Sequence, residues 1–254
     1  MKVAGLDIGS RTIALVELAE NGDTNSTVLD TSYDPLNQCQ SLLKGKHYDC
    51  MLATGYGRHL AQANFASDTV TEIKAFAVGA SHIYPNCRAV LDIGGQDMKV
   101  ITLADDGKVK DFDINDRCAA GTGKFLEVMA EALNFSIQEL GGEALKAKAP
   151  TKINSVCTVF AESEVISLIA RGENRRDIAY GIHEAISERI AAMINRMGVS
   201  GDLIFAGGVA YNKCIRHILE KKLNLRIYVP DNPQIVGALG AALLAERRAE
   251  VATS

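Results

Sequence analysis

The sequence has no apolar run long enough to cross a membrane and no cluster of basic residues. Its longest apolar stretch near the end, residues 236–245, is far shorter than the roughly 20 residues of a transmembrane helix. The formal net charge is −4, so nucleic acid is not an expected main partner. The opening residues MKVAGLDIGS are typical of a strand rather than of a secretion signal. We therefore expect a soluble cytoplasmic protein.

The six cysteines form no C-x-x-C pair, which excludes a zinc ribbon and a compact ferredoxin-type motif. Disulfide bonds are not expected in a reducing compartment. A free cysteine is most often a small buried apolar residue, and this is the interpretation for Cys39, Cys50, Cys87 and Cys214. Any metal site must therefore gather cysteines that are distant in the sequence or that come from two chains.

The P-loop pattern G-x-x-x-x-G-K-S/T is absent as well. The GTGKF segment at residues 121–125 has neither the first glycine at the required spacing nor the hydroxyl residue after the lysine. A nucleotide site of the P-loop type is therefore excluded.

A repeated segment is present instead. It reads KVAGLDIGSRTIALVEL at residues 2–18 and CRAVLDIGGQDMKVITL at residues 87–103. Each copy combines an apolar strand, an Asp-Ile-Gly turn and a second strand, which predicts a β-hairpin with an aspartate near its tip. Two such hairpins indicate a duplicated unit, and hence two similar halves that face each other.

Strand-like and helix-like patterns alternate through the rest of the chain, which predicts an α/β fold around a sheet rich in parallel strands. The further strands are expected at residues 49–54, 108–114, 203–206 and 225–229, and the helices at residues 72–83, 119–133, 156–170, 178–197, 213–222 and 233–248. We expect one lobe from residues 1–82 plus 233–254 and a second from residues 83–232. The halves are expected to join near residues 78–88.

The glycine-rich turns suit a nucleotide. A glycine after a strand lets backbone N–H groups approach a phosphate, and Asp7 and Asp92 suit a Mg²⁺ ion held through water. Gly207, Gly208 and Val209 follow another expected strand and would allow the close approach of a flat adenosine. The hairpins thus predict a triphosphate and Mg²⁺ clamped between two lobes.

Five stretches in this order resemble the actin, heat-shock chaperone and sugar-kinase ATPase superfamily, which has a duplicated, ribonuclease H-like, two-lobed fold. They are a first phosphate turn at 5–12, a second at 92–97, an adenosine turn at 207–210, and connecting helices near 156–170 and 233–244. The resemblance implies ATP or ADP as ligand, with Asp7 and Asp92 near Mg²⁺ and Gln96 orienting the attacking water. The cofactor-binding residues expected in this chain are Gly9, Ser10, Arg11, Thr12, Gly94, Gly95, Gln96, Gly121, Thr122, Gly123, Glu162, Gly207, Gly208, Val209 and Gln234.

Two further segments are more specific. NDRCAAGTG at residues 115–123 and VCTVFAESEV at residues 156–165 closely resemble the ATP-dependent activators of 2-hydroxyacyl-CoA dehydratases and the related ATPase subunits of benzoyl-CoA reductase. The resemblance covers nearly the whole chain. In this family two cysteines from each of two identical subunits hold one 4Fe–4S cluster, which implies Cys118 and Cys157 as the metal ligands of a homodimer.

The same resemblance implies an oxygen-sensitive, anaerobic electron-transfer protein. Ferredoxin or flavodoxin would reduce the cluster, and ATP hydrolysis would drive one electron to an iron–sulfur acceptor enzyme, with a 2-hydroxyacyl-CoA dehydratase preferred. A double-cubane-cluster or benzoyl-CoA-reductase-type acceptor is the alternative within the family. A small-molecule kinase and a regulatory ATPase without redox chemistry are the alternatives of a different class.

Two site residues keep open interpretations. After Ser10 the family usually continues with small hydroxyl residues and then a lysine, whereas this sequence has Arg11 and no lysine near Ala14, which leaves open whether Arg11 replaces that charge. Glu162 is a candidate for the nucleotide or Mg²⁺ shell, but a carboxylate early in a helix also favours the helix dipole without any ligand.

Overall fold

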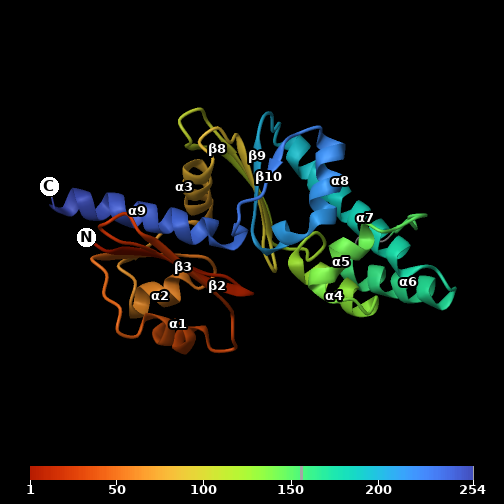
Figure 1. Ribbon diagram of the computed structural model, residues 1–254, viewed down its shortest axis with the longest axis horizontal. Coiled ribbons are helices and arrows are strands. Elements are labelled where there is room, and N and C mark those ends of the chain that lie inside the picture. Colours follow the sequence, from red (N-terminus) through yellow and green to blue (C-terminus); the bar gives the residue numbers. More distant parts are fainter. Residues whose placement is uncertain (155–156, 254) are drawn as a thin grey trace.

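The computed structural model describes residues 1–154 and 157–253. In this part of the chain the strands form two five-stranded sheets with the same order (Figure 1). The first sheet has the order β3-β2-β1-β4-β5, with β1 (Val3–Ile8), β2 (Thr12–Leu18), β3 (Thr24–Asp30), β4 (Cys50–Thr54) and β5 (Asp68–Thr69). The second has the order β8-β7-β6-β9-β10, with β6 (Ala89–Ile93), β7 (Met98–Leu103), β8 (Val109–Asn115), β9 (Leu203–Ala206) and β10 (Ile227–Tyr228). The predicted duplication is confirmed.

The two aspartates of the repeated turns occupy equivalent positions. Asp7 lies opposite Ala14 in the antiparallel hairpin β1–β2, and Asp92 lies opposite Lys99 in the hairpin β6–β7. On its other side each of these central strands pairs in parallel, β1 with β4 and β6 with β9. Strands buried on both faces read as continuous apolar runs, as β1 and β6 do.

The helices are distributed unevenly around the sheets, as Figure 1 shows. They are α1 (Pro35–Leu43), α2 (Arg58–Asn64), α3 (Glu72–Ile83), α4 (Gly123–Ala132), α5 (Ile137–Ala144), α6 (Thr158–Ala170), α7 (Arg175–Arg196), α8 (Lys213–Leu223) and α9 (Val236–Thr253). Helices α4 to α8 gather beyond the second sheet, while α9 packs on β1, β2 and β4 of the first. None of the described helices is both long and apolar enough to span a bilayer.

Helices α3 and α9 cross at two glycines. A Cβ atom on Gly240 of α9 would lie 1.8 Å from the carbonyl oxygen of Ala75, and one on Gly79 of α3 would lie 2.1 Å from that of Val236. Helix α3 also contacts β6, β7 and β8, so this crossing joins the two sheets. Only glycine allows two backbones to approach so closely.

This crossing corrects one prediction. Residues 156–170 and 233–244 were expected to supply the connecting helices, but the helix that packs on α9 is α3, whereas α6 packs on α4 and α7. The expected helix begins at Val156, which lies outside the described residues, as do Ser155 and Ser254. The pattern of residues 72–83 carried the missed signal, since Gly79 lies within the run of small and apolar residues at 75–80 and allows close packing.

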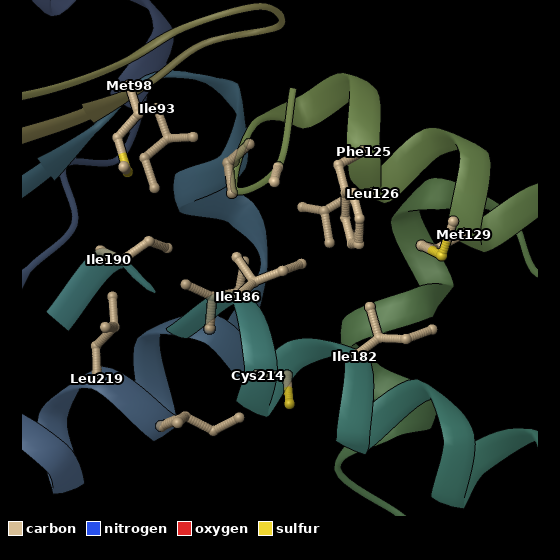
Figure 2. Packing of buried hydrophobic residues seen from close by; sticks show 14 of the residues in the cluster. Ile93, Met98, Phe125, Leu126, Met129, Ile182, Ile186, Ile190, Cys214 and Leu219 are labelled. Atoms are coloured by element: carbon tan, nitrogen blue, oxygen red, sulfur yellow. The ribbon is translucent and has the colours of Figure 1, made fainter. Parts of the chain in front are cut away.

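Helix α4 is fixed to the second sheet through a large core. In Figure 2 the side chains of Phe125, Leu126 and Met129 from α4 face the isoleucines of α7. Ile93 and Met98, which flank the turn between β6 and β7, belong to the same core. These side chains are buried. The close packing of such a core transmits displacements, so α4 is rigidly related to the β6–β7 turn.

Candidate functional site

A cleft of about 1020 Å³ lies between the two sheets, at the ends of the strands that carry the repeated turns. Its size is at the upper end for ligand sites. It brings together many of the residues singled out from the sequence. These are Asp7, Gly9, Ser10, Arg11, Thr12, Asp92, Gly94, Gly95, Gly123, Gly207, Gly208, Val209 and Gln234.

Four other predicted cofactor-binding residues lie outside this lining. Gln96 is exposed at the tip of the β6–β7 hairpin, and Glu162 is exposed on α6. Thr122 is fully buried and its hydroxyl donates to the carbonyl oxygen of Ala119 at 2.7 Å. Gly121, with φ +93°, packs instead near the side chains of α7. The roles expected of these four residues stay predictions.

Two glycines close over the aspartates in the same way. Gly55 follows β4 with φ +85°, and a Cβ there would lie 2.5 Å from Oδ1 of Asp7. Gly207 follows β9 with φ +80°, and a Cβ there would lie 2.6 Å from Oδ1 of Asp92. The left-handed backbone and the lack of space both require glycine at these positions. The two halves therefore present the same carboxylate-and-glycine unit to the cleft.

The floor of the cleft holds a buried lysine among three carboxylates. The Nζ atom of Lys99 lies 2.7 Å from Glu72, 2.7 Å from Asp97 and 3.2 Å from Asp92. Lys99 is only 4% exposed. Burial opposes its charge, but Asp92, Glu72 and Asp97 raise the pKa of Lys99 well above its ordinary value. Lys99 is therefore a permanent cation that holds these carboxylates together.

The carboxyl groups of Asp7 and Asp92 are weaker acids than usual, because their pKa values are raised. Burial, with the charges of Glu72 and Asp92 adding to it, raises the pKa of Asp7 to about 8. Burial also raises the pKa of Asp92, to about 6, although the charge of Lys99 opposes this shift. A divalent cation placed beside Asp7 would displace its proton and favour the carboxylate.

The opposite side of the cleft is held by a hydrogen-bonded pair, the half-buried amide of Asn212 and the buried imidazole of His183. The side-chain oxygen of Asn212 caps α8 by accepting from the backbone N–H groups of Cys214 and Ile215 at 3.1 Å each. Its Nδ2 atom donates to Nε2 of His183 at 2.9 Å, while Nδ1 of His183 donates to the carbonyl oxygen of Ala179 at 2.7 Å. Burial lowers the pKa of His183 to about 4, so the ring is neutral. This network fixes the start of α8, where Tyr211 and Lys213 line the cleft.

The cysteines divide into two groups. Cys39, Cys50, Cys87 and Cys214 are buried, as expected of structural thiols. Cys118 is partly exposed in the loop between β8 and α4, and Cys157 is exposed at the N-cap of α6. Two accessible thiols are half of a four-thiolate site. Within the described residues no group of three or more ligating side chains gathers for a metal ion.

The helix that follows the Cys118 loop is joined to the second phosphate turn through backbone hydrogen bonds. The first two N–H groups of α4, from Gly123 and Lys124, donate to the carbonyl oxygens of Gly94 and Gly95 at 2.9 Å each. The side chain of Asn115 donates to the carbonyl oxygen of Cys118 at 3.0 Å. The second phosphate turn therefore holds the helix that directly follows the Cys118 loop.

Several residues of the site were missed by sequence analysis. Lys99 and Glu72 complete the carboxylate cluster, and Glu127 faces Arg11 across the cleft. A lysine in the apolar strand MKVITL was a signal, because a charged residue inside a buried strand needs a partner. Nothing in the sequence reveals Glu127, whose position depends on how the two lobes face each other.

Comparisons with known proteins agree with this geometry. Residues 4–245 match the model of the BadF/BadG/BcrA/BcrD ATPase family. The chain is 38% identical to the (R)-2-hydroxyglutaryl-CoA dehydratase activating ATPase of Acidaminococcus fermentans, covering 96% of this chain and 97% of that protein. It is 31% identical to a benzoyl-CoA reductase subunit of Thauera aromatica, covering 94% and 91%.

A solved structure is equally similar. The activator of the 2-hydroxyisocaproyl-CoA dehydratase from Clostridium difficile, with bound ADPNP, superimposes with a TM-score of 0.92 at 37% identity. The match covers 100% of this chain and 97% of that one. The fold is thus the two-lobed α/β fold of the actin-like ATPases, and the chain belongs to the BadF/BadG/BcrA/BcrD ATPase family.

Proposed function

We propose that this chain is an ATP-driven electron-transfer activator for an iron–sulfur enzyme, with a 2-hydroxyacyl-CoA dehydratase as the preferred acceptor. The observation that carries the proposal is the backbone link from the nucleotide turns to the Cys118 loop, through the hydrogen bonds of Gly123 and Lys124. A kinase or a simple nucleotide switch has no need of an accessible cysteine in the loop beside such a link, or of a second accessible cysteine at residue 157.

ATP and ADP are the proposed ligands of the cleft. Asp7 and Asp92 would hold Mg²⁺, since both carboxyl groups lie at the ends of central strands and line the cleft. The glycine turns offer N–H groups to phosphates, and Gln96 would orient the attacking water once the lobes close. The bound ADPNP in the related C. difficile structure supports this assignment.

Cys118 and Cys157 fit a cluster shared by two copies of the chain. Each copy offers two accessible thiols, whereas a 4Fe–4S cluster takes four. A closed two-fold dimer supplies them from one repeated surface. When bound, the cluster supplies one-electron transfer from a ferredoxin or flavodoxin donor. The residues that follow Cys118, namely Ala119, Ala120 and Gly121, are small and would leave room for the cluster.

The lobes proposed to move are residues 1–82 with 233–254 and residues 83–232. They would turn about the α3–α9 crossing, where Gly79 and Gly240 let the two backbones touch. Closure of the lobes around ATP would then move the Cys118 loop through α4, because the start of α4 is hydrogen-bonded to the second phosphate turn.

A second candidate is an acceptor of the benzoyl-CoA-reductase type. The 31% identity to the T. aromatica benzoyl-CoA reductase protein favours it, since the match spans 94% of this chain. Both candidates share the cluster and the ATP site, so they differ only in the protein that receives the electron.

Iron and acid-labile sulfide analysis after oxygen-free purification tests the proposal. The wild type should hold about two iron atoms per chain, and Cys118→Ser and Cys157→Ser should each lose them. Cys87→Ala, a change at a buried thiol, should keep them. Iron retained in both serine variants, or absent from carefully protected wild type, would contradict the electron-transfer function.

A further inference from the structure

An ion pair crosses the cleft between the two phosphate turns. Arg11, in the β1–β2 turn, places a guanidinium nitrogen 2.5 Å from Oε1 of Glu127 on α4. Its side chain lies over the second turn, since a Cβ on Gly95 would stand 2.0 Å from Cγ of Arg11. Arg11 therefore connects the first turn both with the second turn and with the helix that follows the Cys118 loop.

The backbone around Arg11 is held while its side chain is free to change partners. The backbone N–H of Thr31 donates to the carbonyl oxygen of Arg11 at 2.9 Å. The hydroxyl of Thr31 donates to the carbonyl oxygen of Gly9 at 2.9 Å. The N–H of Gly9 in turn donates to the carbonyl oxygen of Thr12 at 2.9 Å. The Arg11 side chain itself is 54% exposed, so only this side chain needs to move.

A terminal phosphate competes with Glu127 for this guanidinium. Arg11 lines the same cleft as Ser10, Thr12 and Gly94, where the phosphate turns face each other. A guanidinium binds phosphate and carboxylate in the same forked geometry, so one side chain cannot serve both fully. A triphosphate carries more charge at this end than a diphosphate and is the stronger competitor.

We propose that Arg11 distinguishes ATP from ADP by exchanging Glu127 for the terminal phosphate. Without a triphosphate the Arg11–Glu127 pair ties the first turn to α4. With a triphosphate the guanidinium turns to the phosphate and releases α4 from the first turn. The inference rests on the proposed nucleotide site, and it adds the residue pair through which that site would act on the Cys118 loop.

Isothermal calorimetry with Mg·ADPNP and Mg·ADP tests this exchange. Glu127→Gln should raise the affinity for Mg·ADPNP about two- to fivefold, the range of an exposed ion pair, and the affinity for Mg·ADP less. Arg11→Gln should lower the Mg·ADPNP affinity, and in that background Glu127→Gln should have no further effect. Glu131→Gln, one turn along α4, removes the same charge away from Arg11 and should leave the ratio of the two affinities unchanged.

The outcomes separate the exchange from the nucleotide site itself. Equal effects of Glu127→Gln on both nucleotides, or additive effects in the double variant, would overturn the exchange while leaving ATP binding intact. A wild type that binds neither nucleotide would overturn both. Thermal melting checks that each variant is folded. Arg11→Lys, which keeps the charge without the fork, should give an intermediate Mg·ADPNP affinity, and a wild-type value there would also contradict the exchange.

Discussion

Replacing Lys99 by methionine is expected to destabilise the protein strongly. The substitution keeps much of the side-chain volume but removes the cation from three carboxylates, two of which lie within 2.7 Å of it. Breaking a buried ion pair typically costs about 3–5 kcal/mol. For a chain of this size each kcal/mol lowers the melting temperature by about 2–4 °C, so a decrease of about 6–20 °C is expected at pH 8.

The pH dependence of this loss gives the sharper test. Without Lys99 the pKa of Asp92 rises further, because the cation is the main cause that lowers it. A carboxyl group whose pKa is raised in the folded state destabilises the protein fully above that pKa, and the destabilisation decreases as the pH falls from that pKa toward the unfolded-state pKa. The difference in melting temperature between Lys99→Met and wild type should therefore decrease from pH 8 to pH 5.

Thermal melting followed by circular dichroism across this pH range is the assay. Lys108→Met, at an exposed lysine paired with Asp106, should leave the melting temperature unchanged. A Lys99→Met variant that melts with the wild type at pH 8, or whose deficit grows toward pH 5, would refute the role of Lys99 as the fixed cation of the cleft.

Three other parts of the structure can be tested in the same way: the helix crossing, Asp7 and the cap of α8. Gly240→Ala at the helix crossing should lower the free energy of unfolding, measured with urea, by about 1–3 kcal/mol or more. Gly142→Ala in α5, where an added Cβ meets nothing within 4 Å, should not lower it. Binding of Mg·ADPNP at pH 7 should release about one proton, because the pKa of Asp7 is about 8 and the bound cation favours its carboxylate. Calorimetry in buffers of different ionisation enthalpy measures this release. No proton release by the wild type, or a release that persists in Asp7→Asn, would contradict the prediction. Asn212→Ala should cost about 1–2 kcal/mol through loss of the α8 cap, and unchanged stability would argue against that cap.

The sequence predicts the parts of the fold that repeat or alternate strongly. The two Asp-Ile-Gly hairpins, the long helix α7 and the strand β9 were expected close to their observed bounds. The elements β3, α1, α2, β5 and α5 were not expected, since they are short or exposed. Helix α5 had a usable signal in its capping box, where Ser136 and Glu139 satisfy each other's backbone N–H groups.

The site was predictable where glycine or aspartate has few structural alternatives. The turns at Gly9, Gly94 and Gly207 meet in the cleft as expected. The partners of these turns were not predictable, because Glu72 and Glu127 lie on helices whose approach depends on the packing of the two lobes. Local patterns indicate which residue types can bind a ligand, whereas charge partners across a cleft depend on tertiary structure.

Native mass spectrometry of protein purified without oxygen tests the central claim most directly. We predict a dimer of the 27.2 kDa chain that carries a single 4Fe–4S cluster, and a monomer without iron for Cys157→Ser. A wild-type monomer with its own cluster, or a dimer that is equally stable and equally loaded after Cys157→Ser, would contradict a cluster shared through Cys118 and Cys157.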